Sequence, residues 1–216
     1  MMWLWAALSS SAVLLLARTA AASASSSPAP WPDAFSVKFL TNATTNSSDR
    51  STCVRNTLHY DWGLKMQAVV HGPGAIECAH FYNTSSACTL VFTAESMYRV
   101  LAEPRAGQKR CCKDTGSPFG MTPPTWASGS NATFEGFVQD PFSGMLAKKF
   151  AWPQLAGPMG MHTYLETTVG QRQPLAFTFP AHNGLQDYHF LTDTQTNTRP
   201  DAGVFALPGE CADEVC

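Results

Sequence analysis

The chain has 216 residues, with 14 Lys and Arg against 16 Asp and Glu, so its formal net charge is −2. A charge this close to neutral argues against a phosphate-binding surface, and we expect no nucleic-acid partner. Once an N-terminal leader is set aside, the length fits one domain with a proper hydrophobic core.

Residues 1–24 are typical of a secretory signal peptide. An apolar stretch from Met1 to Leu16 precedes small residues that offer A-x-A-like cleavage sites. Arg18 follows the apolar stretch rather than preceding it, which leaves a retained signal anchor as the alternative. All seven cysteines lie after this segment. The combination predicts a secreted, extracellular protein with disulfide bonds.

Residues 25–55 are predicted to form a flexible, glycosylated segment with one short strand. Ser, Ala and Pro dominate its first part, residues 34–40 have a strand pattern, and residues 41–52 are polar without an apolar period. Four N-x-Ser/Thr acceptor sites for N-linked glycans occur in the chain, at Asn42, Asn46, Asn83 and Asn131. We therefore expect a glycoprotein.

The strongest periodic signal runs from Leu58 to Val70, where apolar and mostly polar side chains alternate. A period of two predicts one unusually long strand with one apolar face. Shorter strand patterns follow at residues 88–92, 96–101, 133–138, 145–152, 161–169, 174–179 and 185–191. The sequence therefore predicts a mostly β fold, with one antiparallel domain over residues 56–216. Helix signals are weak, and residues 181–187 are the one place left open for a helix.

Candidate chemistry is sparse. The chain has neither G-x-S-x-G nor H-E-x-x-H, and its histidines are scattered singly. Cys78 with His80 comes nearest to a reactive cysteine, but a cysteine in a cysteine-rich secreted chain is more often half of a disulfide. His59 and Asp61 share a strand face, yet two ligands are too few for a metal site. We therefore expect no enzyme.

The apolar side chains of the predicted strands must cover a wide surface. Periodicity alone favours a packed core, and a curved sheet that encloses a cavity for an apolar ligand is the alternative. The residues expected to line such a cavity are Tyr60, Trp62, Leu64, Met66, Phe92, Phe134, Phe177 and Phe190.

Several stretches between about Asn56 and Cys216 resemble a known protein family in their order and spacing. They are TLHYDWGLKMQAVV, CTLVFTAESMYRV, MTPPTW, NATFEG, KKFAW, HTYLETTVGQRQPLAFTF and RPDAGVFALPGEC. Together they are similar to the ependymin-related family of secreted glycoproteins. The resemblance implies a strongly curved antiparallel sheet, a half-open barrel like that of bacterial lipoprotein carriers, around an apolar cavity.

That resemblance also implies function. Family members bind lipids or other hydrophobic small molecules, are commonly homodimers, and in some cases bind calcium. A non-enzymatic protein that holds an apolar ligand in its cavity is thus the first expectation. The alternative is a calcium-dependent cell-adhesion or matrix glycoprotein with a packed core, in contact with matrix or a membrane surface.

Carried over by position, the family's disulfides imply pairings for this chain. Cys78 would bond to Cys216, and Cys112 or its neighbour Cys111 would bond to Cys211. Cys53 would then take the spare member of the Cys111–Cys112 pair, or Cys88, as its partner, with an odd cysteine left over.

The C-terminal sequence VFALPGECADEVC is predicted to be a last strand or an extended arm. Phe205 and Leu207 would add to the apolar interior, and Pro208 would end the apolar run. Disulfides from Cys211 and Cys216 would bind this arm to the first half of the chain.

Overall fold

The computed structural model describes residues 27–42, 52–114, 120–153, 162–168, 172–181, 184–212 and 215–216. The predicted signal peptide and the acceptor site Asn46 lie outside these residues. No helix in the described part of the chain is long and apolar enough to span a membrane.

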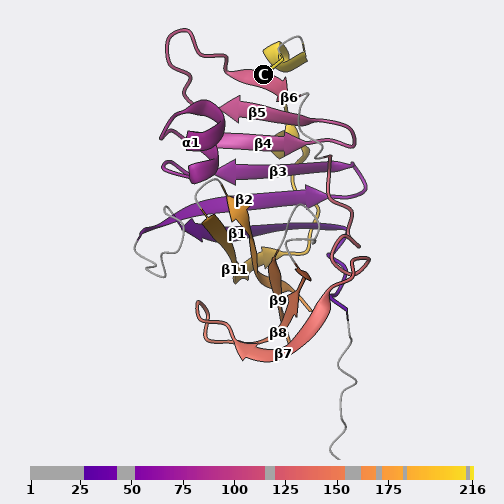
Figure 1. Ribbon diagram of the computed structural model, residues 1–216. Coiled ribbons are helices and arrows are strands. Elements are labelled where there is room, and N and C mark those ends of the chain that lie inside the picture. The colour runs from indigo at the N-terminus through magenta and orange to yellow at the C-terminus, as the bar shows by residue number, and fades with distance from the viewer. Residues whose placement is uncertain are drawn as a thin grey trace, which may run out of the picture.

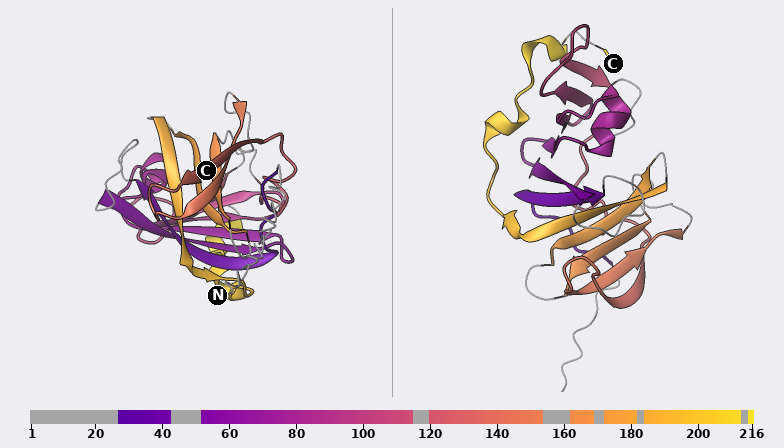
Figure 2. Two further views of the ribbon diagram at one scale, coloured as in Figure 1. Left: turned by 90° about the horizontal axis from the view of Figure 1, so that it is seen from below. Right: turned by 90° about the vertical axis from the view of Figure 1, so that its left-hand side faces the viewer.

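The fold is one antiparallel sheet of eleven strands. In chain order they are β1 (Ala34–Asn42), β2 (Cys53–Asp61), β3 (Met66–His71), β4 (Cys88–Phe92), β5 (Met97–Leu101), β6 (Cys111–Asp114), β7 (Thr133–Gln139), β8 (Leu146–Ala151), β9 (Thr163–Thr167), β10 (Pro174–Ala181) and β11 (Gly184–Thr196). Their order across the sheet is β6-β5-β4-β3-β2-β1-β11-β10-β9-β8-β7. The sheet curves without closing, so that β7–β10 turn away from the direction of β2–β6 (Figures 1 and 2). The predicted mostly β, half-open fold is confirmed.

The predicted long strand between Leu58 and Val70 is wrong, because the chain reverses in its middle. β2 ends at Asp61, whose side chain accepts a hydrogen bond from the Leu64 amide at 3.1 Å. Lys65 completes the turn in the left-handed region with a φ of 55°. The apolar alternation runs on through this turn, so it gives no sign of the reversal, whereas the Asp-Trp-Gly sequence is turn-like.

β1 is a central strand of the sheet, paired with β2 on one side and β11 on the other. Its alternate side chains Phe35, Val37 and Phe39 are buried, as the period-two rule requires. The domain boundary expected at residue 56 is therefore wrong. The sheet starts at Ala34, and Trp31 just before it is also buried.

The helical elements differ from expectation. One short helix, α1 (Ile76–Tyr82), follows β3 and ends at Asn83, which adopts the left-handed conformation with a φ of 49°. No pattern in the sequence predicts α1, because seven residues give too short a window for helical periodicity. Within the stretch 181–187, left open as a helix, the described residues belong to strands: Ala181 ends β10 and residues 184–187 begin β11.

Side chains from the two faces of the sheet form separate cores. The main core consists of Trp31, Phe35, Val37, Phe39, Leu58, Tyr60, Met121, Trp126, Ala127, Phe150, Trp152, Tyr164, Tyr188 and Phe190. A smaller outer cluster consists of Ala68, Val91 and Phe205. Neighbouring residues of β3 belong to different clusters, Val69 to the main core and Ala68 to the outer one, since successive side chains of a strand point to opposite faces.

The C-terminal arm after β11 holds the outer cluster in place. It is not a strand but contains two short 3-10 helices, η4 (Ala202–Phe205) and η5 (Gly209–Ala212). Phe205 is buried against Ala68 and Val91, and Leu207 packs beside it. Both were expected in the apolar interior, but they lie in the outer cluster, on the face of the sheet opposite the main core. The arm runs along one face of β2–β6 while α1 covers the other face (Figure 2).

Two disulfides fix this arm to β6. Cys111 bonds to Cys211, one of the two pairings left open, and Cys112 bonds to Cys216. Adjacent residues of a strand point to opposite faces, so the two disulfides attach to opposite faces of β6. There the Cys216 amide donates to the carbonyl of Lys113 at 2.9 Å. The predicted binding of the arm to the first half of the chain is confirmed.

The remaining pairings differ from those implied by the family resemblance. Cys78 bonds to Cys88 rather than Cys216, because α1 packs directly on β4 and brings the two Cα atoms to 5.6 Å. Cys53 lies outside the three disulfides, since each partner considered for it is bonded elsewhere.

Candidate functional site

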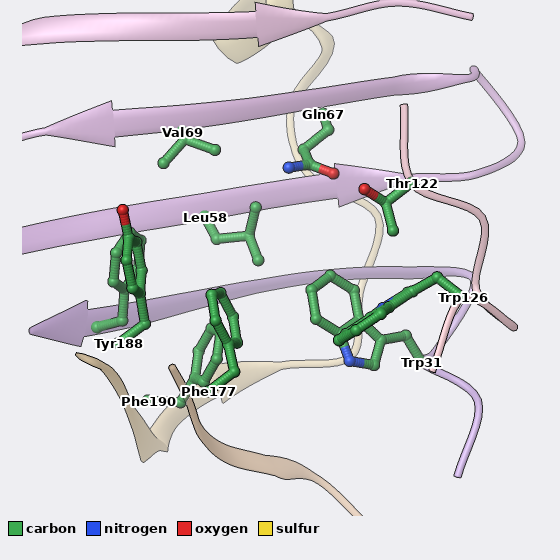
Figure 3. Close-up of a pocket in the computed structure, with 10 residues that line it drawn as sticks. Trp31, Leu58, Gln67, Val69, Thr122, Trp126, Phe177, Tyr188 and Phe190 are labelled. Atoms are coloured by element: carbon green, nitrogen blue, oxygen red, sulfur yellow. The ribbon is translucent and has the colours of Figure 1, made fainter. Parts of the chain in front are cut away.

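An apolar cavity lies inside the curve of the sheet, within the main core. Its lining residues are Trp31, Phe39, Leu58, Gln67, Val69, Thr122, Trp126, Phe177, Tyr188 and Phe190 (Figure 3). The cavity volume is about 60 Å³. That is room for more than a single water molecule, which needs roughly 10–15 Å³, but it is well below the roughly 300–1,000 Å³ of common small-molecule pockets.

The cavity walls come from strands that the curve of the sheet brings face to face. β1, β2 and β3 supply Phe39, Leu58 and Val69, and β10 and β11 supply Phe177 and Phe190. Successive side chains of a strand point to opposite faces of the sheet, and these five side chains all lie on the inward face.

The eight side chains expected in the cavity fall into three groups. Phe177 and Phe190 line it. Four others belong to the main core or pack against it without lining the cavity; they are Tyr60, Trp62, Phe92 and Phe134. Leu64 and Met66 are corrections: Leu64 lies in the β2–β3 turn with 43% of its surface exposed, and Met66 packs against the outer cluster. Both errors follow from treating a hairpin as one strand.

Trp31 lines the cavity although no sequence pattern predicts it there. Its ring makes edge-on contacts with the rings of Tyr60, Trp126 and Phe190, at centroid distances of 5.6, 5.3 and 6.4 Å. It lies at the end of a Ser, Ala and Pro stretch that is typical of a flexible tail, and a single aromatic residue there was the only signal.

The segment Ser27–Pro32, here called the N-terminal strap, holds Trp31 in the cavity wall. The Ala29 amide donates to Glu166 Oε2 at 2.8 Å, and Arg172 donates to the Ser27 carbonyl at 2.7 Å. Arg172 also forms an ion pair with Glu166, whose side chain is fully buried. The Trp31 amide donates to the Pro124 carbonyl at 2.9 Å. A few polar contacts to β9 and to two loop segments thus fix the strap.

A buried polar cluster adjoins the cavity at Tyr188, at the end away from Trp31 and Trp126 (Figure 3). The hydroxyl of Tyr188 donates to Glu77 Oε1 from α1, and Gln186 Nε2 donates to the same oxygen at 3.1 Å. His71 Nδ1 lies 3.5 Å from Glu77 Oε2. These four residues connect α1 to β3 and β11.

Burial sets the protonation of this cluster. It lowers the pKa of the His71 imidazole, and the nearby Glu77 carboxyl only partly offsets that effect. Burial, with Glu77 as a second cause, raises the pKa of Tyr188 well above its ordinary value. Both side chains are therefore neutral near pH 7, and sequence reasoning missed them because each is an isolated polar residue in an apolar pattern.

A second, wider cleft lies where the β7–β8 turn approaches β1, β2 and β11. Its volume is about 430 Å³ and its lining is mixed: Leu40, Cys53, Arg55, Asp140, Phe142, Ser143, His189, Phe190, Leu191, Thr192 and Asp193. The ring of Phe142 stacks on His189 at 4.1 Å. Asp140 is buried and accepts from the Ser143 amide at 2.7 Å, which shapes the turn.

The other residues expected to form sites do not lie together in one place. Within the described residues, no group of three or more His, Cys, Asp or Glu side chains has the arrangement of a metal site. Asp61 instead forms an ion pair with Arg199 at 2.8 Å, and His59 hydrogen-bonds Ser36 at 2.8 Å. The acceptor sites Asn83 and Asn131 are exposed. The three disulfides are compatible with a secreted or extracellular protein.

No family model matches the chain, and no curated protein matches it. Among solved structures, the chain is similar to an uncharacterized conserved protein from Thermus thermophilus. The two share 13% sequence identity with a TM-score of 0.49, over 86% of this chain and 90% of that chain. A likeness this distant carries no argument about function, and membership of the ependymin-related family stays a prediction.

Proposed function

We propose that this protein is a secreted, non-enzymatic carrier that binds an apolar ligand in the cavity of its curved sheet. One observation supports the proposal above all: the cavity is lined almost wholly by apolar and aromatic side chains, in a sheet that does not close. Apolar cavities of this kind stay dry and accept apolar groups.

The cavity volume sets a condition on this function. About 60 Å³ holds only a short part of an acyl chain, so a longer ligand needs more room. Three wall residues, Trp31, Thr122 and Trp126, lie outside the strands of the sheet. Of these, Trp31 is the one we expect to yield, because a few hydrogen bonds hold the N-terminal strap that carries it. Binding is therefore proposed to displace the Trp31 ring and widen the cavity toward the strap.

Native mass spectrometry of the glycoprotein, purified after mild extraction, tests the proposal. We expect additional mass from bound lipid-like molecules, and uptake of a neutral fluorescent lipid by the stripped protein. A protein that carries no such mass and takes up no fluorescent lipid would instead support the adhesion alternative. Calcium-dependent self-association of the purified protein would then be the next measurement.

A further inference from the structure

The wider cleft beside β1, β2 and β11 has the size of a small-molecule site. Its volume is about 430 Å³, within the roughly 300–1,000 Å³ of common ligand pockets. Leu40 lines this cleft and directly follows Phe39, which lines the apolar cavity. Successive side chains of a strand point to opposite faces, so the cleft and the apolar cavity are reached from different faces of β1.

Charged side chains of both signs line the cleft. Arg55 lies on β2, Asp193 on β11, and Asp140 at the β7–β8 turn. Phe142, from the same turn as Asp140, stacks on His189 of β11. Both carboxyl groups therefore belong to the β11 side of the cleft, and the guanidinium group belongs to the β2 side.

These charged groups do not pair with one another. Within the described residues, none of Arg55, Asp140 and Asp193 forms an ion pair. Asp140 Oδ2 accepts a hydrogen bond from the Ser143 amide at 2.7 Å, whereas Oδ1 accepts none from a described residue. Arg55 and Asp193 are both exposed, so groups of a ligand can reach them.

The strands set the distance between the two charged sides. β1 lies between β2 and β11, and neighbouring strands are about 4.8 Å apart, so the backbones of β2 and β11 are separated by about 10 Å. Leu40 is the direct cross-strand neighbour of Arg55, and it places an apolar side chain between the two sides. A ligand that reaches both sides needs an apolar middle and two charges about 10 Å apart, which is the length of an extended tripeptide at about 3.4 Å per residue.

We propose that this cleft binds an extended zwitterion of tripeptide length, with its carboxylate on Arg55 and its ammonium group at the side of Asp140 and Asp193. The site is separate from the apolar cavity and does not depend on the carrier function. A guanidinium group binds a carboxylate through paired N–H donors. A ligand with only a carboxylate lacks the cation that the two carboxyl groups favour, and a ligand with only an amine leaves Arg55 without an anion.

The test uses one tripeptide with free and with blocked ends. Isothermal titration calorimetry at pH 7 compares Ala-Leu-Ala, its N-acetylated form, its C-terminal amide and free leucine, each added to the full mature glycoprotein. We expect the unblocked tripeptide to bind tightest and each blocked form to bind at least about fivefold more weakly, since one end then loses its charge-assisted hydrogen bonds. Free leucine should also bind at least about fivefold more weakly, because its two charges are too close together to reach both sides.

Variants at the two sides separate the two contacts. Arg55→Gln should bring the unblocked tripeptide and its amide to within about twofold of each other, while the acetylated form stays weaker than the unblocked one. Asp193→Asn should narrow the difference between the unblocked and acetylated forms and leave the amide weaker. Arg105→Gln and Glu103→Gln are the matched controls, because both positions are exposed in the β5–β6 connection and neither lines the cleft. Both controls should keep the wild-type ranking.

A neutral fluorescent probe distinguishes this site from the apolar cavity. N-phenylnaphthylamine bound in the cavity should not be displaced by the tripeptide, and displacement would overturn the assignment to the cleft. The proposal is also overturned if no tripeptide binds, if the blocked forms bind as tightly as the unblocked one, or if Arg55→Gln keeps the wild-type difference between the tripeptide and its amide. None of these results bears on lipid uptake, which tests the carrier function separately.

Discussion

The two halves of the sheet are held together in different ways. In the described residues, all three disulfides belong to the half built from β2–β6, where they join α1 to β4 and the C-terminal arm to β6. The half built from β7–β11 is held by packing of its aromatic rings and by the N-terminal strap. Covalent restraint therefore lies away from the Trp31 end of the cavity, and the wall that must yield to a ligand is held by non-covalent contacts alone.

Breaking the covalent restraint should have the largest effect. The disulfides Cys111–Cys211 and Cys112–Cys216 join residues 100 and 104 positions apart. A loop of this length contributes roughly 4–5 kcal/mol in the chain-entropy account. Cys211→Ser combined with Cys216→Ser should therefore lower the free energy of unfolding by several kcal/mol, measured by urea unfolding. Cys53→Ser, which breaks none of the three described disulfides, is the control, and equal stability of both variants would contradict the role of the arm.

Removing the Trp31 ring tests the half of the sheet that is held by non-covalent contacts. Trp31→Ala should cost about 3–5 kcal/mol, as for other buried Trp residues, and should increase uptake of a fluorescent fatty alcohol by enlarging the cavity. Trp62→Ala is the control, because Trp62 packs against the main core without lining the cavity. Loss of stability without any gain in uptake would make Trp31 a core residue only.

Loosening the strap is a milder change in the same region. Glu166→Gln weakens the ion pair with Arg172 and the bond from the Ala29 amide. We expect a loss of about 1–3 kcal/mol, typical of a disturbed buried hydrogen bond, and faster amide hydrogen exchange at Ala29 and Trp31, the residues of this stretch that carry an amide hydrogen. Exchange that stays as slow as in the wild type at these amides would show that the strap is fixed by Trp31 packing instead.

The smallest effect concerns pH and the attachment of α1. The pKa of His71 is lowered from 6.5 by burial, so the unfolded chain binds a proton at a higher pH than the folded chain does. The free energy of unfolding should therefore fall as pH drops below about 6.5, by at most about 1.4 kcal/mol per pH unit. His71→Gln should flatten this dependence in urea unfolding at pH 7.5 and 5.5. An unchanged slope would exclude His71 as the titrating group.

Sequence periodicity predicted most of the strands but not every turn between them. Most strands were predicted, because each has its own alternating pattern between turn residues. The β2–β3 hairpin was missed, since the alternation continues through the turn at Trp62–Lys65. That error alone moved Leu64 and Met66 into the expected cavity.

The candidate site was predictable only where it consists of strand residues. Phe177 and Phe190 lie on strands with a regular pattern, and both were found. Trp31 and Glu77 were not, because one follows a Ser and Pro tail and the other lies on a helix of seven residues. Their roles depend on long-range contacts to β9 and β11, which no local pattern records.

The two edges of the sheet have different consequences for association between copies. At the β6 edge, Val215 already forms a bridge to Lys113, so that position is taken by the chain's own C-terminus. In the described part of the chain, β7 has no strand on its outer side, and it presents Phe137 with 53% of its surface exposed. Pairing of β7 with β6 of another copy would repeat without end, whereas pairing of β7 with β7 closes at two. Within the described residues, the bridge from Val215 to Lys113 covers one position of the β6 edge, so pairing of β7 with β7 of a second copy is the less obstructed of the two arrangements.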